Sequence, residues 1–250
     1  LAACKAAGVS AKIYISAGYD EYTARKHPEW LGIYQKGKPQ EPNGFRRFCF
    51  NSGYLDLLKE QAREVVKKYK PDGVFFDIVA NWPCYCDNCI ADMKKKGLDP
   101  ENEDDLWQQS RDVAQHYFDE MDKVVHEVSP ETVIFQNSGG FEIGARSKIE
   151  CCDQLELESL PTGGWGYDAY PMTMSYIRRF GKNCIGMTGK FHRAWGEFGG
   201  YKYKEALRYE AAQNLTFGTG MNVGDQLHPS GRLDAYTYEM IGETMQFMRA

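Results

Sequence analysis

Six short apolar runs recur along the chain, and longer segments with a helical pattern separate most of them. The candidate strands are Lys12–Ser16, Gly73–Asp77, Thr132–Gln136, Gln154–Ser159, Cys184–Thr188 and Gly218–Val223. Helical patterns cover residues 54–70, 104–128, 170–181, 202–215 and 233–249. Strands that alternate with helices in this way predict βαβ units and a parallel sheet, and therefore an α/β fold.

Polar side chains stand at the carboxyl ends of most of these predicted strands. They are Ser16, Asp77, Gln136, Glu156 with Glu158, and Asn222. In a (β/α)₈ barrel the active site is built at this end of the strands. A doubly wound open sheet is the alternative, but no Gly-x-Gly-x-x-Gly phosphate loop follows any predicted strand. The pattern therefore favours the barrel.

Only six of the eight strands of such a barrel can be recognised. We therefore expect a TIM barrel that is truncated at its N-terminus, with strands 3–8 visible. The first residues (Leu1, Cys4, Ala7) look like the end of an amphipathic helix, and the chain does not begin with Met. We expect residues 1–250 to be one catalytic domain that lacks about two N-terminal βα units.

Composition narrows the function further. The net charge of −5 argues against a nucleic-acid partner, which would usually require a basic stripe. No run of about 18 apolar residues is present, so no membrane span is expected. Aromatic residues make up 14% of the chain. They either fill the core or line a cleft in which rings stack on a ligand.

Three carboxylates attract attention by their positions. Asp77 ends the apolar run Val74–Phe76, where it either caps the following turn or lies at a catalytic rim. Glu156 and Glu158 alternate with leucines, so the two glutamates share one face of their strand. If the leucines pack against helices, both glutamates point into the barrel mouth, where water, a metal or a polar ligand must meet them.

A pair of carboxylates that faces a cleft is the minimum apparatus for glycoside hydrolysis, with one at the sugar carbon and one as proton donor. Metal-bound acids, as in enolase-type or aldolase-type barrels, are the rival interpretation. Such sites need carboxylates at several successive strand ends, where this chain has Gln136, Thr188 and Asn222. The residues therefore favour the hydrolase.

Four segments, in the right order, resemble motifs of the α-L-fucosidases of glycoside hydrolase family 29. They are "AAGVSAKIYIS", "YKPDGVFFD", "ELESLPTGGWGY" and "GMNVGDQLHPSGRLD". "HPEWL", "CFNSGY", "KFHRAWGEFGG" and the cysteine cluster look closer to family 151 α-L-fucosidases and to the hypothetical glycosyl hydrolase 6 group. The resemblance implies a retaining mechanism with Asp77 as the nucleophile.

The acid/base residue is less clearly implied. Glu156 aligns with the strand glutamate of family 29, and Glu158 shares its face. The preceding loop, from which the proton donor of that family often comes, offers Glu142 and Glu150, and Glu197 is a further alternative. Substrate contacts are expected from residues near the strand ends: Trp165, Tyr167, His192, Trp195, Asn222 and Asp225.

Cys84, Cys86 and Cys89 form a C-x-C-x-x-C motif after the Asp77 strand. Close spacing strains a disulfide but suits thiolates that converge on one metal. Cys49 is the best fourth ligand. The arrangement resembles the Cys₄ zinc site of family 42 β-galactosidases, so we expect structural zinc, with reduced thiols or disulfides as alternatives. Zinc thiolates favour a reducing compartment, and hence a cytoplasmic location.

The sequence therefore predicts a retaining glycoside hydrolase, an α-L-fucosidase that acts on fucosylated glycans without a cofactor for catalysis. There are two alternatives: a β-galactosidase-like hydrolase with structural zinc, and a non-catalytic carbohydrate-binding barrel. The expected partner is a carbohydrate substrate, with no nucleic acid and no membrane. A homo-oligomer of the full-length protein stays open.

Overall fold

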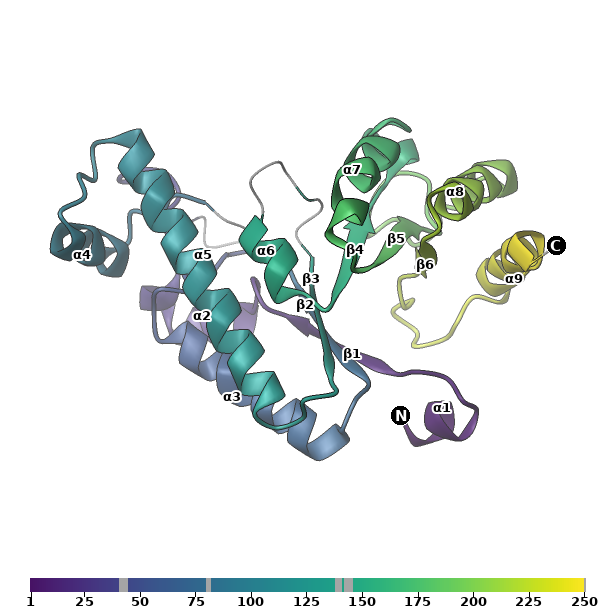
Figure 1. Ribbon diagram of the computed structural model, residues 1–250, viewed down its shortest axis with the longest axis horizontal. Helices are drawn as coiled ribbons and strands as arrows, with labels where there is room; N and C mark the ends of the chain where they lie inside the picture. Colours follow the sequence, from purple (N-terminus) through teal and green to yellow (C-terminus); the bar gives the residue numbers. More distant parts are fainter. Residues whose placement is uncertain (41–44, 80–81, 138–140, 142–145, 250) are drawn as a thin grey trace. The chain divides into compact units, whose positions relative to one another are not determined.

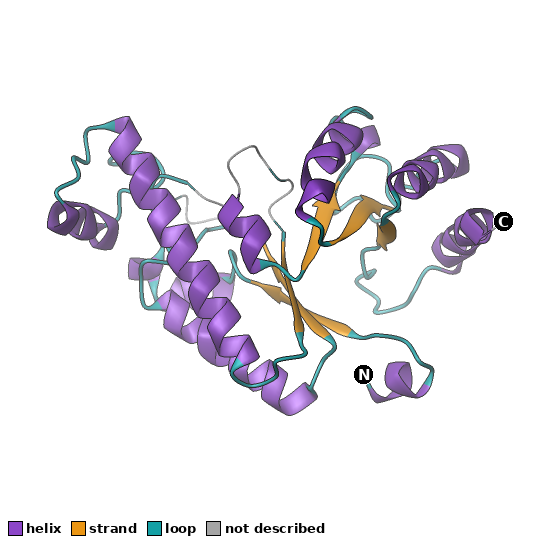
Figure 2. Ribbon diagram, in the orientation of Figure 1, coloured by secondary structure: helices purple, strands orange, loops and turns teal. Residues whose placement is uncertain are grey.

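The computed structural model describes residues 1–40, 45–79, 82–137, 141 and 146–249. The chain divides into two compact units. The first comprises residues 1–138 and 150–152, and the second residues 139–149 and 153–250. Each unit contains one three-stranded parallel sheet flanked by helices (Figures 1 and 2). In the described part of the chain no helix is both long and apolar enough to cross a membrane.

The first unit contains strands β1 (Lys12–Ser16), β2 (Gly73–Asp77) and β3 (Val133–Gln136) in the order β1-β2-β3. In the register of the first pair, Ser16 lies opposite Asp77. Its helices are α1 (Ala2–Ala6), α2 (Glu21–Lys26), a 3₁₀ turn (Pro28–Trp30), α3 (Tyr54–Tyr69), α4 (Asp87–Lys96) and α5 (Glu103–His126).

The core of the first unit follows from two periodicities. Alternate strand residues, such as Val74 and Phe76, are fully buried together with α3 residues spaced at i, i+4 and i+8, namely Leu58, Ala62 and Val66. Helices α3 and α5 lie side by side (Figure 1). The opposite face of the sheet carries the other strand residues, and Asp77 is the last of them along β2.

The second unit contains strands β4 (Gln154–Glu158), β5 (Asn183–Gly189) and β6 (Gly220–Gly224) in the order β4-β5-β6. Helix α7 packs on β4, and α8 packs on β5, β6 and α9. These helices are α7 (Ala169–Ile177), α8 (Lys204–Phe217) and α9 (Ala235–Arg249), with 3₁₀ turns at Pro161–Gly163 and Arg178–Phe180. Helix α6 (Arg146–Cys151) contributes residues to both units.

The α/β class predicted from the sequence is confirmed, and all six strands begin and end within two residues of their predicted bounds. Among the helices of the described residues, α2, α4 and α6 were not predicted. Each is short, so its apolar pattern repeats too few times to stand out. The closed barrel, the two preceding βα units and the single domain stay predictions.

Candidate functional site

Asp77 lies half-buried at the carboxyl end of β2, and its two carboxylate oxygens have different partners. Oδ2 accepts a hydrogen bond of 2.7 Å from the Tyr14 hydroxyl, and Oδ1 accepts one of 2.8 Å from the backbone N–H of Ile78. One oxygen therefore caps the turn that follows the strand, and the other faces a neighbouring strand. No ion pair to Asp77 forms within the described residues, so its charge is oriented by neutral donors.

The backbone turns sharply immediately after Asp77. Ile78 has a φ of +64°, a left-handed conformation that a β-branched residue rarely adopts and that costs about 1–3 kcal/mol. Its carbonyl oxygen lies so close to Gly18 that a β-carbon on that glycine would be 2.1 Å away. The Asp77 carbonyl also accepts hydrogen bonds from the N–H groups of Ala17 and Gly18. Glycine at position 18 thus permits the strained turn that presents Asp77.

Glu156 and Glu158 are buried on β4, with relative exposures of 4% and 8%. Asn222, on β6, donates from Nδ2 to Glu156 Oε1 at 3.1 Å across the intervening strand. Trp195 donates from its indole nitrogen to Glu158 Oε1 at 2.8 Å. The structure therefore brings four of the predicted site residues together on one sheet face.

Trp195 belongs to a loop, residues 190–203, that a buried ion pair anchors. Lys202 Nζ lies 2.7 Å from Glu210 Oε2 and 2.5 Å from Thr188 Oγ1, and the side chains of the ion pair are 1% and 5% exposed. Burial raises the pKa of Glu210 and lowers the pKa of Lys202, because each loses the water that would solvate its charge. The Lys202 N–H also bonds the Lys190 carbonyl at 2.7 Å, which closes the loop.

Other predicted substrate contacts have separate environments. Tyr167 packs edge-to-face on Tyr209 of α8, and His192 packs edge-to-face on Tyr203. Asp225 accepts a hydrogen bond from the N–H of Gln226. Trp165 is 43% exposed in its glycine-rich loop. Among the described contacts, none joins these four residues to Glu156 or Glu158.

The structure describes two of the three glutamates that are alternatives for the proton donor. Glu142 lies outside the described residues. Glu197 accepts a hydrogen bond from the backbone of Arg193 in its own loop, and Glu150 is exposed on α6.

Two polar residues at strand ends do not belong to the site face. Gln136 bonds Tyr117 of α5 at 3.0 Å, and Thr188 bonds Glu210 of α8 at 2.7 Å. Both side chains therefore point to the helices, because alternate residues of a strand face opposite sides. Both residues lie at or next to the carboxyl end of a strand, as predicted, but their side chains belong to the helix-facing side of each sheet.

The cysteine cluster is assembled as the spacing predicts. The Sγ atoms of Cys49, Cys84, Cys86 and Cys89 all lie within 4.8 Å of one another, and all four residues are buried. Cys49 and Cys89 approach to 3.4 Å without a disulfide. Four thiolates 2.3 Å from a tetrahedral zinc ion would lie roughly 3.8 Å apart, so the residues fit such an ion.

The electrostatics of the cluster also suit a metal. Hydrogen bonds from the other thiols, that from Cys49 first, lower the pKa of Cys86, which also accepts the backbone N–H of Cys89. Cys86 stands at the N-cap of α4, where the helix dipole favours a thiolate. Hydrogen bonding to the Cys84 thiol raises the pKa of Cys49. The four sulfur atoms thus compete for the thiol protons. A bound cation would replace these protons and would let all four cysteines be thiolates.

Sequence reasoning missed Tyr14 as a partner of Asp77. The signal was present, because Tyr14 precedes Ser16 by two residues and so shares its strand face, and Ser16 is the residue opposite Asp77. The Lys202–Glu210 pair left no such signal, because nothing in the sequence distinguishes these two residues from surface charges.

The comparisons with known proteins bear on the family and on the fold of this chain. A family model described as hypothetical glycosyl hydrolase 6 matches residues 1–78. The β-galactosidase from Bacillus circulans sp. alkalophilus has a similar structure, with a TM-score of 0.79 at 14% identity over 99% of this chain and 47% of that one. α-L-Fucosidase AlfC from Lactobacillus casei gives a TM-score of 0.58 at 14% identity, over 99% of this chain and 63% of that one. At these identities the likeness shows the fold alone.

A more specific likeness is to α-L-fucosidase isoenzyme 2 from Paenibacillus thiaminolyticus. It is 42% identical to this chain with a TM-score of 0.94, over 100% of this chain and 38% of that one. The resemblance to α-L-fucosidase-like glycoside hydrolases is thus confirmed, although the chain spans only about two fifths of that enzyme. No curated protein matches the chain.

Proposed function

We propose that this chain is the catalytic part of a retaining glycoside hydrolase, an α-L-fucosidase that acts on fucosylated glycans. The observation that carries the proposal is Asp77: a half-buried carboxylate at the carboxyl end of a parallel strand, oriented by two neutral donors. The 42% identity to an α-L-fucosidase over the whole chain supports the substrate class.

The fold proposed for this function is a (β/α)₈ barrel, to which the six strands contribute strands 3–8. Two three-stranded parallel sheets, each with its helices, are the building units of such a barrel. Asp77 and Glu158 are the last residues of their strands, at the end where barrel enzymes carry their chemistry, and Glu156 lies two residues before Glu158 on the same strand face.

In the proposed mechanism, an oxygen of Asp77 attacks the anomeric carbon and forms a glycosyl ester as the bond to the leaving oxygen breaks. The hydrogen bonds from Tyr14 and from the Ile78 N–H orient the carboxylate without neutralising its charge. A carboxyl group gives its proton to the leaving oxygen and later takes one from the water that hydrolyses the ester.

We assign this second role to the glutamate pair of β4, with Glu142 as the alternative. Asn222 and Trp195 hold one oxygen each of Glu156 and Glu158. A proton donor works only within hydrogen-bond reach of the leaving oxygen, so such orientation is part of its task.

For the cysteine cluster we propose structural zinc, held by Cys49, Cys84, Cys86 and Cys89. A site with four protein ligands leaves no open position for substrate, so the ion would stabilise the loop after Asp77 and take no part in the reaction. Zinc-bound thiolates favour a reducing compartment, so the location that goes with this proposal is the cytoplasm.

The test replaces Asp77 by glycine in the intact protein and measures aryl α-L-fucoside hydrolysis. We expect loss of turnover and its recovery with azide, which occupies the space of the lost carboxylate and yields fucosyl azide. Asp72→Asn is the matched control, since Asp72 caps the amino side of the same strand by accepting the Ala11 N–H. Wild-type turnover in the glycine variant would refute the nucleophile assignment.

A β-galactosidase-like activity is the second candidate, favoured by the cysteine cluster and by the structural likeness to such an enzyme. A panel of aryl glycosides separates the two. Turnover of the β-galactoside alone would replace the fucosidase proposal, and turnover of none would favour a carbohydrate-binding role.

A further inference from the structure

Four side chains of the first unit form a continuous stack, which we call the ring ladder: Phe45, Tyr19, Arg47 and Trp82. Phe45 stacks on Tyr19 with ring centroids 5.4 Å apart and planes at 21°. The Arg47 guanidinium carbon lies 5.8 Å from the Tyr19 ring and 5.4 Å from the Trp82 ring. Phe45 and Trp82 are 80% and 50% exposed, so the ends of the ladder are open to solvent.

The ladder is connected through the backbone to the ends of β1 and β2, and Asp77 is the last residue of β2. Tyr19 follows Gly18, whose N–H bonds the Asp77 carbonyl, and Tyr19 pairs with Arg47 in an antiparallel bridge. A sugar unit next to the one attacked by Asp77 would therefore be close to these rings.

Gln40 holds the strand segment that contains Arg47. Its side-chain oxygen accepts the Arg47 N–H at 2.7 Å, and its nitrogen donates to the Arg47 and Gly32 carbonyls at 2.6 and 2.8 Å. Arg47 lies two residues before Cys49, and Trp82 two residues before Cys84, so the cysteine cluster fixes both segments. The Arg47 and Trp82 members of the ladder are thus held in place by their own segments, and Phe45 is held by its stacking on Tyr19.

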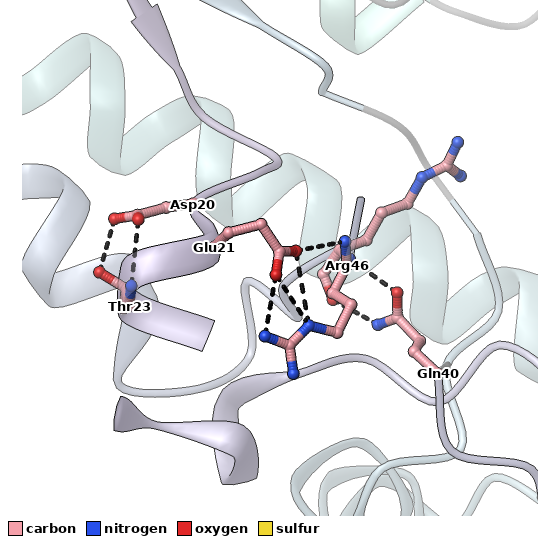
Figure 3. Close-up of polar contacts among 6 residues, drawn as sticks. Asp20, Glu21, Thr23, Gln40 and Arg46 are labelled. Atoms are coloured by element: carbon pink, nitrogen blue, oxygen red, sulfur yellow. Dashed lines mark hydrogen bonds and ion pairs between the residues drawn. The ribbon is translucent and has the colours of Figure 1, made fainter. Parts of the chain in front are cut away.

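The two adjacent arginines differ in a way that points to a ligand. Figure 3 shows the Arg46 guanidinium directed at the Glu21 carboxylate, which it meets at 2.9 and 3.1 Å, and this ion pair lowers the pKa of Glu21. Among the described contacts, the Arg47 guanidinium donates only its Nε–H, to the Tyr19 hydroxyl at 2.9 Å. Its other N–H groups meet no acceptor in the described part of the chain.

We propose that the ring ladder binds a second sugar unit of an oligosaccharide substrate, beside the unit whose bond is broken. The C–H faces of a sugar stack on aromatic rings, and its hydroxyls accept hydrogen bonds from the remaining Arg47 N–H groups. This inference rests on the proposed function, because it assigns the rings to the substrate of Asp77.

The experiment compares two substrates that differ in their second unit. α-L-Fucosyl fluoride has no second sugar, whereas a fucosylated trisaccharide does. In Phe45→Ala and Trp82→Ala we expect kcat/KM for the trisaccharide to fall by about 3- to 10-fold per ring, with fucosyl fluoride hydrolysis unchanged. Tyr22→Ala is the matched control, an exposed ring of the same unit outside the ladder, and it should change neither rate.

Unchanged trisaccharide kinetics in both variants, or equal losses on the two substrates, would overturn the ladder as a sugar site. If the wild-type protein hydrolyses neither substrate, the proposed function fails, and the ladder is then tested by calorimetric binding of an oligosaccharide panel. Binding that Trp82→Ala and Phe45→Ala weaken supports the ladder. Absent binding, or binding that neither variant weakens, refutes it.

Discussion

The two sheets present their acids in contrasting ways. At the end of β2, Asp77 is half-buried and is held by a neighbouring hydroxyl and by its own turn. At β4, Glu156 and Glu158 are buried, and each accepts a hydrogen bond from a side chain of another segment. An accessible carboxylate suits attack on a sugar carbon, whereas enclosed carboxyl groups suit controlled proton transfer.

The anchors of the two sites differ as well. The loop after Asp77 leads into the cysteine cluster, a set of four thiols drawn from two segments. The loop that brings Trp195 to Glu158 is anchored by the buried Lys202–Glu210 ion pair. The loop after Asp77 thus depends on a cysteine cluster with the dimensions of a metal centre. The loop that carries Trp195 depends on the attraction between two buried, opposite charges. The following predictions test this contrast.

The largest effect is expected from the acids themselves. Asp77→Gly should lower kcat/KM by about 10⁴-fold, roughly 5.5 kcal/mol, whatever the leaving group, because the proposed nucleophile would be needed for every substrate. Glu156→Gln or Glu158→Gln should cost about 10²- to 10⁴-fold with a poor leaving group and far less with dinitrophenol, which departs without a proton. If the rate loss in both glutamine variants were the same for good and poor leaving groups, the proton donor would lie elsewhere. Glu142 would then be the next residue to test.

Breaking the buried ion pair should unfold the second unit more easily. Lys202→Met leaves Glu210 buried without its cation, which we expect to cost about 3–5 kcal/mol in chemical denaturation. Lys204→Met is the control, because the neighbouring Lys204–Glu243 pair is partly exposed and should contribute below about 1 kcal/mol. Equal losses in the two variants would show that burial of the Lys202 pair has no special weight.

The same variant should have a distinctive pH dependence. The pKa of Glu210 is raised by burial, so the folded state binds more protons than the unfolded state above the ordinary value of 4.5. Stability must then decrease as pH rises through the window between that value and the folded pKa. Lys202→Met should therefore lose less stability at pH 5 than at pH 7.5, relative to wild type, in urea unfolding at both pH values.

Loss of the proposed zinc ion should destabilise the first unit. The reduced protein should contain about one equivalent of zinc, and Cys86→Ala should lose it together with at least roughly 3 kcal/mol of stability. That loss corresponds to a fall in Tm of about 6–12 °C. Cys4→Ser, outside the cluster, should retain both metal and Tm. Less than about half an equivalent of zinc in wild type would refute the site.

The smallest effects concern the strained turn. Gly18→Ala would place a methyl group 2.1 Å from the Ile78 carbonyl, at an expected cost of about 1–3 kcal/mol and with lower activity, because the turn that presents Asp77 must shift. Gly242→Ala lies in α9 with nothing within 4 Å, and should stabilise by about 0.5–1 kcal/mol. Thermal unfolding and fucoside hydrolysis rates of both variants test this difference. If Gly18→Ala changed neither stability nor activity, the argument for a strained turn would fail.

The strands and the cysteine cluster were predictable because their signals are local. An apolar run ending in Asp77, two glutamates alternating with leucines, and C-x-C-x-x-C each follow from spacing along a few residues. The same reasoning placed Gln136 and Thr188 at strand ends correctly but could not tell that both face helices. Which side of a sheet receives a helix depends on packing between distant segments.

The sequence by itself determined the α/β order of elements, the acids at strand ends and the four candidate ligands, since each depends on periodicity or short spacing. Only the tertiary structure decided that Tyr14 meets Asp77, that Trp195 meets Glu158, and that Arg47 lies between two rings. These pairs are separated by between 28 and 63 residues along the chain. Contacts over such separations arise from how strands align and loops close, and no local pattern records that outcome.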